Sequence, residues 1–253
     1  RFRPMIWSLI LDVNSRITAN PGMYENIKKH FDTIDPKIQR VIDCDVDRTF
    51  IHHRCFLQSS PADSQIDLKP EDFKYNDFSQ HLCFQFKKEE IRNVLCAFAV
   101  THPDINYCQG LNFFAAIFIM FLGEETAFWC LCNLIEKYFP PDYFCNQLKD
   151  FQADLEMMQI LINERTPELA KLAQDIHFEW TLMTSGWLLT LFTNSFPMAT
   201  VLRIWDCFLL EGGKIIFRTG IAFLRKNYPI LKMQQDKIKF CEVCYNLQKE
   251  MVD

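Results

Sequence analysis

Pro103-Asp-Ile-Asn-Tyr-Cys-Gln-Gly-Leu-Asn112 is a short polar turn between two segments rich in apolar residues. Residues 91–100 before it are typical of a helix, and residues 111–122 after it are almost wholly apolar. A helix that is apolar on every side has to be buried, and Pro103 and Gly110 interrupt the helical pattern on the two sides of the turn. The sequence therefore predicts two helices, the second of them buried, joined by this turn.

Gln109 stands where the predicted buried helix begins. A neutral amide in that place suits a side chain that is presented to a ligand. The simpler alternative is that Gln109 caps backbone groups, because turn residues usually serve the turn itself. The turn taken alone favours the simpler alternative, so the decision depends on the rest of the chain.

The composition indicates a large helical protein with an ample core. The chain has 253 residues, of which 49% are hydrophobic and 14% aromatic, with 24 Phe and only 7 Gly. Helical periodicity recurs from end to end, without strand-like alternation or a fixed repeat, which favours an all-α fold. The chain starts at Arg1 without a Met, so we expect a piece of a longer protein.

Charge and hydropathy exclude several classes of function. The net charge is −5 and the isoelectric point about 5.7, which does not suit a nucleic-acid surface. The longest apolar run, residues 113–122, is too short for a transmembrane helix, which needs about 20 residues. No glycine-rich phosphate loop is present, so we expect the chain to bind no nucleotide tightly on its own.

The 11 Cys residues are odd in number and lie in apolar stretches, which fits buried thiols better than a disulfide framework. One CxxC pair, Cys241 and Cys244, lies on a predicted helix. A second loose cluster contains His52, His53 and Cys55. Structural zinc sites need four ligands at coherent spacing, so we expect no metal site. A catalytic Cys-His pair is conceivable, but no local sequence supports an activated thiol.

Asp45 and Arg48 are three residues apart in a predicted helical segment, which places them on one helix face within reach of each other. The simpler interpretation is a surface salt bridge that contributes less than about 1 kcal/mol. The functional interpretation is that Asp45 holds Arg48 ready for an anionic partner, because the planar guanidinium matches phosphate oxygens.

The remaining elements follow from helical spacing and from helix-ending residues. Residues 57–72 are the clearest loop, and a loop of that length is either functional or mobile. Residues 142–165 predict a long amphipathic helix, followed by another that Thr166 caps. Trp205 and Asp206 are interpreted as structural, the ring in the core and the carboxylate as a partner for backbone or for Arg203.

Several short motifs occur together in a fixed order. They are Arg3-x-x-x-Trp7, Ile42-x-x-Asp45-x-x-Arg48-Thr49-Phe50, Tyr107-x-Gln109-Gly110, Trp187-Leu-Leu-Thr-Leu-Phe192 and Arg203-Ile-Trp205-Asp206. In this order they resemble TBC domains, the catalytic domains of GTPase-activating proteins for Rab small GTPases. Each motif alone is weak, whereas five in order are specific, and the resemblance covers essentially the whole chain.

The resemblance implies one all-α domain over residues 1–253, V-shaped and built from two lobes. The N-terminal lobe, about 1–125, would carry both finger motifs, and the C-terminal lobe would cover about 126–253. Arg48 would be an arginine finger and Gln109 a glutamine finger, supported by Asp45, Tyr107 and Gly110. Trp7, Trp187, Arg203, Trp205 and Asp206 would be structural.

The same resemblance implies a Rab-family small GTPase as the partner, with Mg²⁺ and GTP carried by that partner and no cofactor of the chain's own. It also implies a cytoplasmic protein peripheral to endomembranes, in vesicle trafficking. Two departures from the family are visible: Asn106 stands where the family often has Gly, and the loop at residues 57–72 is irregular. The alternatives are a catalytically silent helical adaptor that binds a GTPase or another protein, and a general α-helical interaction domain.

Overall fold

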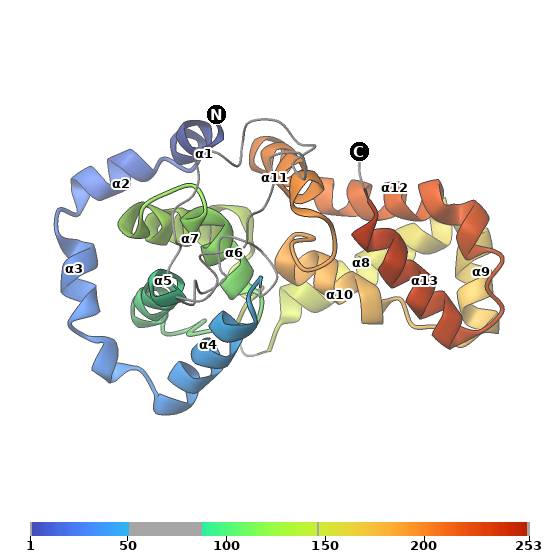
Figure 1. Ribbon diagram of the computed structural model, residues 1–253, viewed down its shortest axis with the longest axis horizontal. Coiled ribbons are helices and arrows are strands. Elements are labelled where there is room, and N and C mark those ends of the chain that lie inside the picture. Colours follow the sequence, from blue (N-terminus) through green and yellow to red (C-terminus); the bar gives the residue numbers. More distant parts are fainter. Residues whose placement is uncertain (1, 51–87, 146, 252–253) are drawn as a thin grey trace, which may run out of the picture. The chain divides into compact units, whose positions relative to one another are not determined.

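A computed structural model describes residues 2–50, 88–145 and 147–251 (Figure 1). Over these ranges the chain forms α-helices and one short 3₁₀ helix, without a β-strand, and the predicted all-α class is confirmed there. The chain divides into two compact units, residues 1–132 and 133–253. Helix α7 (Glu124–Tyr138) runs through the boundary between the units without interruption.

Five short elements open the first unit and run as an arc around its central helices (Figure 1). They are α1 (Arg3–Ile10), α2 (Val13–Ala19), α3 (Met23–Lys28), the 3₁₀ helix η1 (Phe31–Thr33) and α4 (Pro36–Arg48). Trp7 fastens α1 to the interior, because its ring is 1% exposed and packs edge-on against Phe118 and Phe121. The predicted structural role of Trp7 agrees with this burial.

The centre of the first unit is formed by α5 (Lys88–Thr101) and α6 (Leu111–Ile119). Helix α5 packs against α3, α4 and α6, and α4 also contacts α6. Eight of the nine residues of α6 are buried, as the apolar sequence predicts, although the helix ends at Ile119 rather than at Leu122. The turn at residues 103–110 is therefore anchored at both ends by buried helices.

The second unit contains α8 to α13. Their bounds are α8 (Lys149–Arg165), α9 (Pro167–Asp175), α10 (Thr181–Thr190), α11 (Met198–Glu211), α12 (Lys214–Leu231) and α13 (Lys237–Lys249). Helix α12 packs against α8, α10, α11 and α13, so most of the unit is assembled around it. Trp187 of α10 is fully buried, packs against Phe192 and Phe223, and donates from its indole N–H to Gln248 at 2.8 Å.

Two local predictions in the second unit are wrong. Helix α8 begins at Lys149 and not at residue 142, because Tyr143 and Phe144 are buried in a turn where their rings contact Phe139. Thr166 precedes α9 in the N-cap position, but its hydroxyl donates to the Ile162 carbonyl at 2.8 Å and does not cap the helix. In both places packing and backbone hydrogen bonding outweigh the local sequence preference.

In the part of the chain that the structure describes, no helix is both long and apolar enough to cross a membrane.

Candidate functional site

Helix α4 brings Arg48 to the surface of the first unit. The helix begins at Pro36, since the Asp35 carboxylate accepts a hydrogen bond of 2.8 Å from the Lys37 amide and proline suits the first helical turn. Ile42 and Val46 are buried, whereas the Arg48 side chain at the last helical position is 58% exposed. The burial of one face of α4 thus fixes the helix and leaves the guanidinium accessible.

Asp45 connects Arg48 to the turn that contains Gln109. One carboxylate oxygen, Oδ1, pairs with the Arg48 guanidinium at 2.6 Å, and the other, Oδ2, accepts a 2.6 Å hydrogen bond from the Tyr107 hydroxyl. The predicted Asp45–Arg48 pairing is confirmed. The interpretation as an ordinary surface salt bridge is wrong, because the Asp45 side chain is only 4% exposed.

Tyr107 is a fixed hydrogen-bond donor in this arrangement. Burial, together with the hydrogen bond to Asp45, raises the pKa of the Tyr107 hydroxyl above its ordinary range. A phenol that stays protonated continues to donate to the buried carboxylate over the whole physiological pH range. One side chain of the turn is therefore tied to the same acid that holds Arg48.

The turn depends on two residues with positive φ. Asn106 lies at φ 60° and Gly110 at φ 115°. A side chain at Gly110 would strain the backbone, whereas Asn is among the few non-glycine residues that adopt the left-handed region readily. The departure from the family at Asn106 is therefore compatible with the turn that a glycine would form.

Gln109 is exposed at this turn, and Gly110 directly after it is buried. Its neighbour Cys108 is half-buried, and the thiol lies 3.7 Å from the Gln109 carbonyl. Among the described residues the Gln109 side chain makes no hydrogen bond, so the capping role considered from the sequence finds no support there. The arrangement leaves Gln109 exposed at the surface.

Two residues that the sequence analysis did not single out, Asn112 and Thr49, complete the arrangement. The Asn112 amide donates to the Thr49 hydroxyl oxygen at 2.8 Å, and its carbonyl oxygen accepts from the Gly110 amide at 3.1 Å. Thr49 in turn donates to the Asp45 backbone carbonyl at 2.6 Å. The available signal was the presence of Asn112 as the one strongly polar residue in the apolar segment 111–122.

Four further motif residues, Trp187, Arg203, Trp205 and Asp206, lie in the second unit. Trp187 and Trp205 are both fully buried, and the Trp205 indole donates to the Leu191 carbonyl at 3.3 Å. Arg203 is exposed on α11, and Asp206 is half-buried on the same helix. The burial of the two tryptophans agrees with their predicted structural roles.

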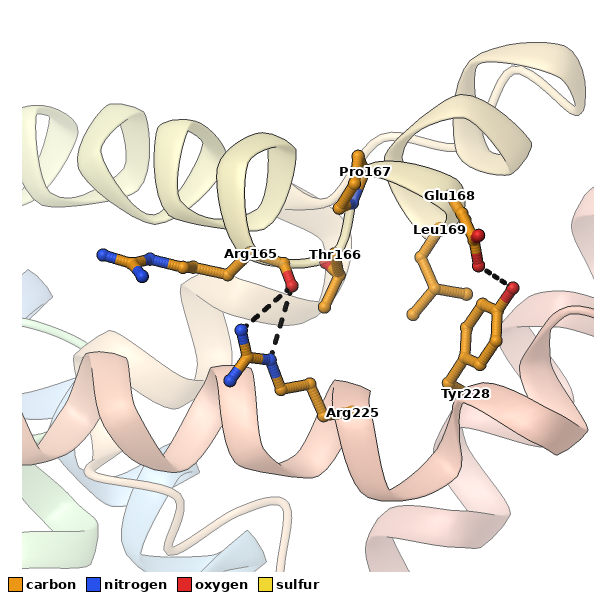
Figure 2. A pocket seen from close by; sticks show the side chains of 7 residues that line it. All are labelled: Arg165, Thr166, Pro167, Glu168, Leu169, Arg225 and Tyr228. Carbon is orange, nitrogen blue, oxygen red and sulfur yellow. Dashed lines mark hydrogen bonds between the residues drawn. The ribbon is translucent and has the colours of Figure 1, made fainter.

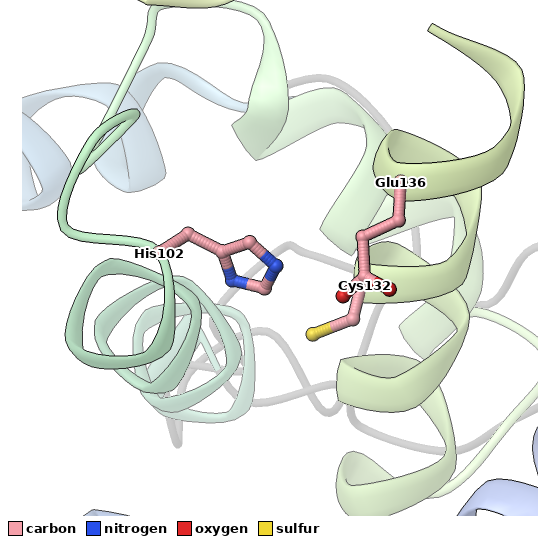
Figure 3. A group of neighbouring side chains, drawn as sticks. All are labelled: His102, Cys132 and Glu136. Atoms are coloured by element: carbon pink, nitrogen blue, oxygen red, sulfur yellow. The ribbon is translucent and has the colours of Figure 1, made fainter. Parts of the chain in front are cut away.

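Among the described residues, one group of three possible metal ligands lies close together, and it consists of His102, Cys132 and Glu136. Cys241 and Cys244 lie on α13, where Cys244 is buried and Cys241 partly exposed. His52, His53 and Cys55 lie outside the described residues. Figure 3 shows the imidazole of His102 turned toward Cys132 of α7, with Glu136 one turn further along that helix. His102 Nδ1 already lies 2.9 Å from the Thr101 hydroxyl, which supports a structural role for this histidine.

A cavity of about 330 Å³ lies in the second unit, where α8 ends, α9 begins and α12 passes beside them (Figure 2). Arg225 donates from Nε and from a terminal nitrogen to the Arg165 carbonyl, both at 3.3 Å, and Tyr228 donates to Glu168. These contacts bind α12 to the α8–α9 corner. We interpret the cavity as a by-product of that corner, because Thr166, Arg225 and Tyr228 direct hydrogen bonds to the protein.

Comparison with known proteins relates the chain to the Rab-GTPase-TBC domain family. The family model RabGAP-TBC, described as Rab-GTPase-TBC domain, matches residues 73–232, a range that includes Tyr107 and Gln109 but begins after Arg48. Human TBC1 domain family member 2A is 33% identical over 234 residues, which are 92% of this chain and 23% of that protein. Zebrafish (Danio rerio) growth hormone-regulated TBC protein 1-A is 31% identical over 242 residues, 95% of this chain and 60% of that protein.

Solved structures confirm the fold. The crystal structure of the Chlamydomonas flagellar RabGAP TBC domain superposes with a TM-score of 0.77 at 22% identity, covering 99% of this chain and 75% of that one. The Ypt/Rab-GAP domain of Gyp1p gives 0.71 at 20% identity, covering 98% and 81%. The predicted TBC-type all-α fold is therefore confirmed, and the chain corresponds to only part of the curated relatives that it matches.

Proposed function

Because the chain belongs to the Rab-GTPase-TBC domain family, we propose that it accelerates GTP hydrolysis by a Rab-type small GTPase. The partner carries GTP and Mg²⁺, and the chain supplies side chains in trans without a cofactor of its own. Arg48 and Gln109 are the proposed catalytic residues, and Asp45, Tyr107 and Gly110 support them. The partner would place the domain at the cytoplasmic face of endomembranes.

The single observation that carries this proposal is the shared carboxylate of Asp45. It accepts from Arg48 on one oxygen and from Tyr107 on the other, and it is buried. A buried acid that joins two motifs 62 residues apart in the chain supports a common purpose for them. Each of the two motifs also presents an exposed residue, Arg48 with its guanidinium and Gln109 with its carboxamide.

The guanidinium is suited to phosphoryl transfer. Water attacks the γ-phosphorus of the GTP, the bond to the bridging oxygen breaks, and negative charge is spread over the transferring group. Arg48 would neutralise part of that charge with a planar set of N–H donors. An arginine supplied in trans accelerates the reaction by about 10³- to 10⁵-fold, or roughly 4 to 7 kcal/mol of barrier.

The carboxamide of Gln109 would orient the attacking water, since an amide both accepts and donates hydrogen bonds. Its backbone is fixed because Gly110 and the first turn of α6 are buried behind it. A polar group held in advance needs little reorganisation during the reaction, which is where most of its catalytic value comes from. Gln109 would then replace the switch glutamine that many GTPases use themselves.

The test is single-turnover GTP hydrolysis with a panel of Rab proteins, followed by four combinations on the most responsive one. The combinations pair wild-type chain or Gln109→Ala with wild-type Rab or a Rab whose switch glutamine is replaced by Ala. We expect the altered Rab to remain stimulated and Gln109→Ala to lose roughly 10²-fold or more in kcat. If the Rab substitution alone ends stimulation while Gln109→Ala has little effect, Gln109 is only a turn residue.

The same panel separates the alternatives. Binding of a Rab without stimulation would support the silent adaptor, and neither binding nor stimulation would favour a general interaction domain. The accessible Arg48 guanidinium favours the activating role over the adaptor.

A further inference from the structure

We propose that Asn112 is a positioning residue that holds both proposed fingers through one buried carboxamide. This inference rests on the proposed function and extends it to a buried residue behind the two fingers. Asn112 is 1% exposed at the second position of α6. It bonds to the residue that follows Arg48 and to the residue that follows Gln109, namely Thr49 and Gly110.

The direction of each hydrogen bond fixes the orientation of the carboxamide. Thr49 has a single hydroxyl proton, and the 2.6 Å contact with the Asp45 carbonyl takes it. The hydroxyl oxygen can therefore only accept from Asn112, which places the amide nitrogen toward Thr49 and the carbonyl oxygen toward the Gly110 N–H. A carboxylate of the same shape cannot donate to Thr49, so an amide is required.

These bonds form a closed circuit between the end of α4 and the start of α6. Asn112 bonds to Thr49, and Thr49 bonds to the Asp45 backbone. The Asp45 carboxylate then bonds to Tyr107. The turn leads from Tyr107 to Gly110, whose amide bonds back to Asn112. Tyr107 also lies 3.4 Å from the Asn112 oxygen, but its proton belongs to the shorter contact with Asp45. All members of the circuit are buried except Tyr107, which is partly buried. Buried networks in which every member is satisfied are rigid.

The consequence is that the two fingers share one support. Arg48 is the last residue of α4 and Gln109 lies in the turn, and a shift of either backbone segment would strain a bond to Asn112. Loss of the carboxamide would leave the Gly110 N–H without its acceptor and Thr49 without its donor. A displacement of about 1 Å in catalytic groups costs on the order of 10²-fold in rate.

The experiment uses Asn112→Ala and a matched pair at the other end of the bond. Thr49→Val keeps the shape but removes the hydroxyl, whereas Thr49→Ser keeps the hydroxyl. The control is Asn227→Ala in the second unit, another buried asparagine, whose amide donates to the Phe223 carbonyl at 2.9 Å. For each variant kcat and KM of Rab GTP hydrolysis are measured together with the melting temperature.

We expect Asn112→Ala and Thr49→Val to lower kcat by about 10- to 100-fold with little change in KM, and Thr49→Ser to recover most of the loss. Asn227→Ala should lower the melting temperature and keep kcat. Arg48→Ala and Gln109→Ala should each lower kcat by a smaller factor in the Asn112→Ala variant than in the wild type. An Asn112→Ala variant with wild-type kcat, or an effect confined to one finger, overturns the proposal.

A readout without the GTPase separates this inference from the proposed function. Hydrogen exchange of the Gly110 amide is expected to be slow in the wild type and much faster in Asn112→Ala, with the Asn227→Ala control unchanged. If no Rab is stimulated by the wild type, the proposed function fails. The exchange experiment still tests whether Asn112 holds the Gly110 amide in place. Equal Gly110 exchange in the wild type and Asn112→Ala overturns the positioning role.

Discussion

Arg48 shows how one residue can be accessible and fixed at the same time. Its guanidinium is 58% exposed, while the carboxylate that holds it is 4% exposed and bonded on both oxygens. An exposed ion pair contributes little because two long side chains have to be ordered. Here one partner is already immobile, so only the arginine has to be ordered, and more than half of its side chain stays exposed.

The choice of arginine leads to the first prediction. Arg48→Ala should remove most GTPase stimulation, by about 10³-fold or more, and Arg48→Lys should restore little, because lysine keeps the charge but loses the planar donor geometry. Single-turnover hydrolysis at matched Rab concentration measures this, with melting temperature as the control for folding. Full activity of Arg48→Lys would remove the finger assignment.

Asn106 provides a second prediction at this scale. Its φ of 60° suits Asn and Gly but strains a β-branched side chain. We expect Asn106→Gly to change the free energy of unfolding by less than about 1 kcal/mol, and Asn106→Val to lower it by about 1 to 2 kcal/mol. Denaturant titration checks both. Equal stability of the two variants would show that the turn adapts to the side chain.

Sequence reasoning recovers the contacts that spacing determines. Asp45 and Arg48 are three residues apart on one helix, so their pairing follows from helical geometry. The bond from Asn112 to Thr49 joins residues 63 apart, and nothing local predicts it. A polar residue in an apolar helix indicates that a buried partner exists, but the packing of α4 on α6 decides which partner it is.

At the scale of helices, α12 packs so closely against α10 that Gly220 leaves no room for a side chain. A methyl group added at Gly220 would lie 2.9 Å from one ring carbon of Trp187 and 3.1 Å from the Met158 methyl. The indole is fully buried and bonded to Gln248, so it has little room to move. Glycine is therefore required for α12 to approach α10.

We accordingly expect Gly220→Ala to lower the free energy of unfolding by about 1 to 3 kcal/mol through overpacking, although alanine favours a helix more than glycine does. Gly213→Ala is the matched control, because a methyl group there meets nothing within 4 Å. Chemical denaturation of both variants measures the difference. A stabilised Gly220→Ala would mean that the indole moves aside.

The sequence predicts which segments form helices better than it predicts the residues at which those helices begin and end. α7 runs over Glu124–Tyr138 as the sequence predicts, because Gly123 and the Pro140-Pro141 pair bracket it. The start of α8 was not predictable, because Tyr143 and Phe144 fit a helical pattern but are held in a turn by contacts with other aromatic rings. Periodicity does not distinguish a helical face from an aromatic cluster.

For the molecule as a whole, the buried thiols limit stability in alkali. Burial raises the pKa of Cys96 from 9.0 to about 11 and that of Cys244 from 9.0 to about 12. The unfolded chain therefore loses these protons before the folded chain does. Their contribution is fully present below about pH 9 and is lost as pH rises to about 11 or 12.

The melting temperature should accordingly fall between pH 9 and pH 11, with Cys96 contributing on the order of 2 kcal/mol. Calorimetry of the wild type and of Cys96→Ala over this range measures it. The variant is expected to be less stable at pH 7 but to show a shallower decline. Parallel declines in the two proteins would assign the alkaline loss to other groups.

Because α7 continues across the boundary between residues 132 and 133, we can predict how the protein responds to proteolysis and to truncation there. Leu131 and Leu134, on either side of the boundary, are both fully buried, and no loop separates the two units there. Proteases need an extended, exposed stretch of chain, so limited digestion should yield no stable pair of halves divided within residues 124–138. A gene segment that ends at residue 132 should likewise give an insoluble product, whereas recovery of two soluble halves would show that each unit folds alone.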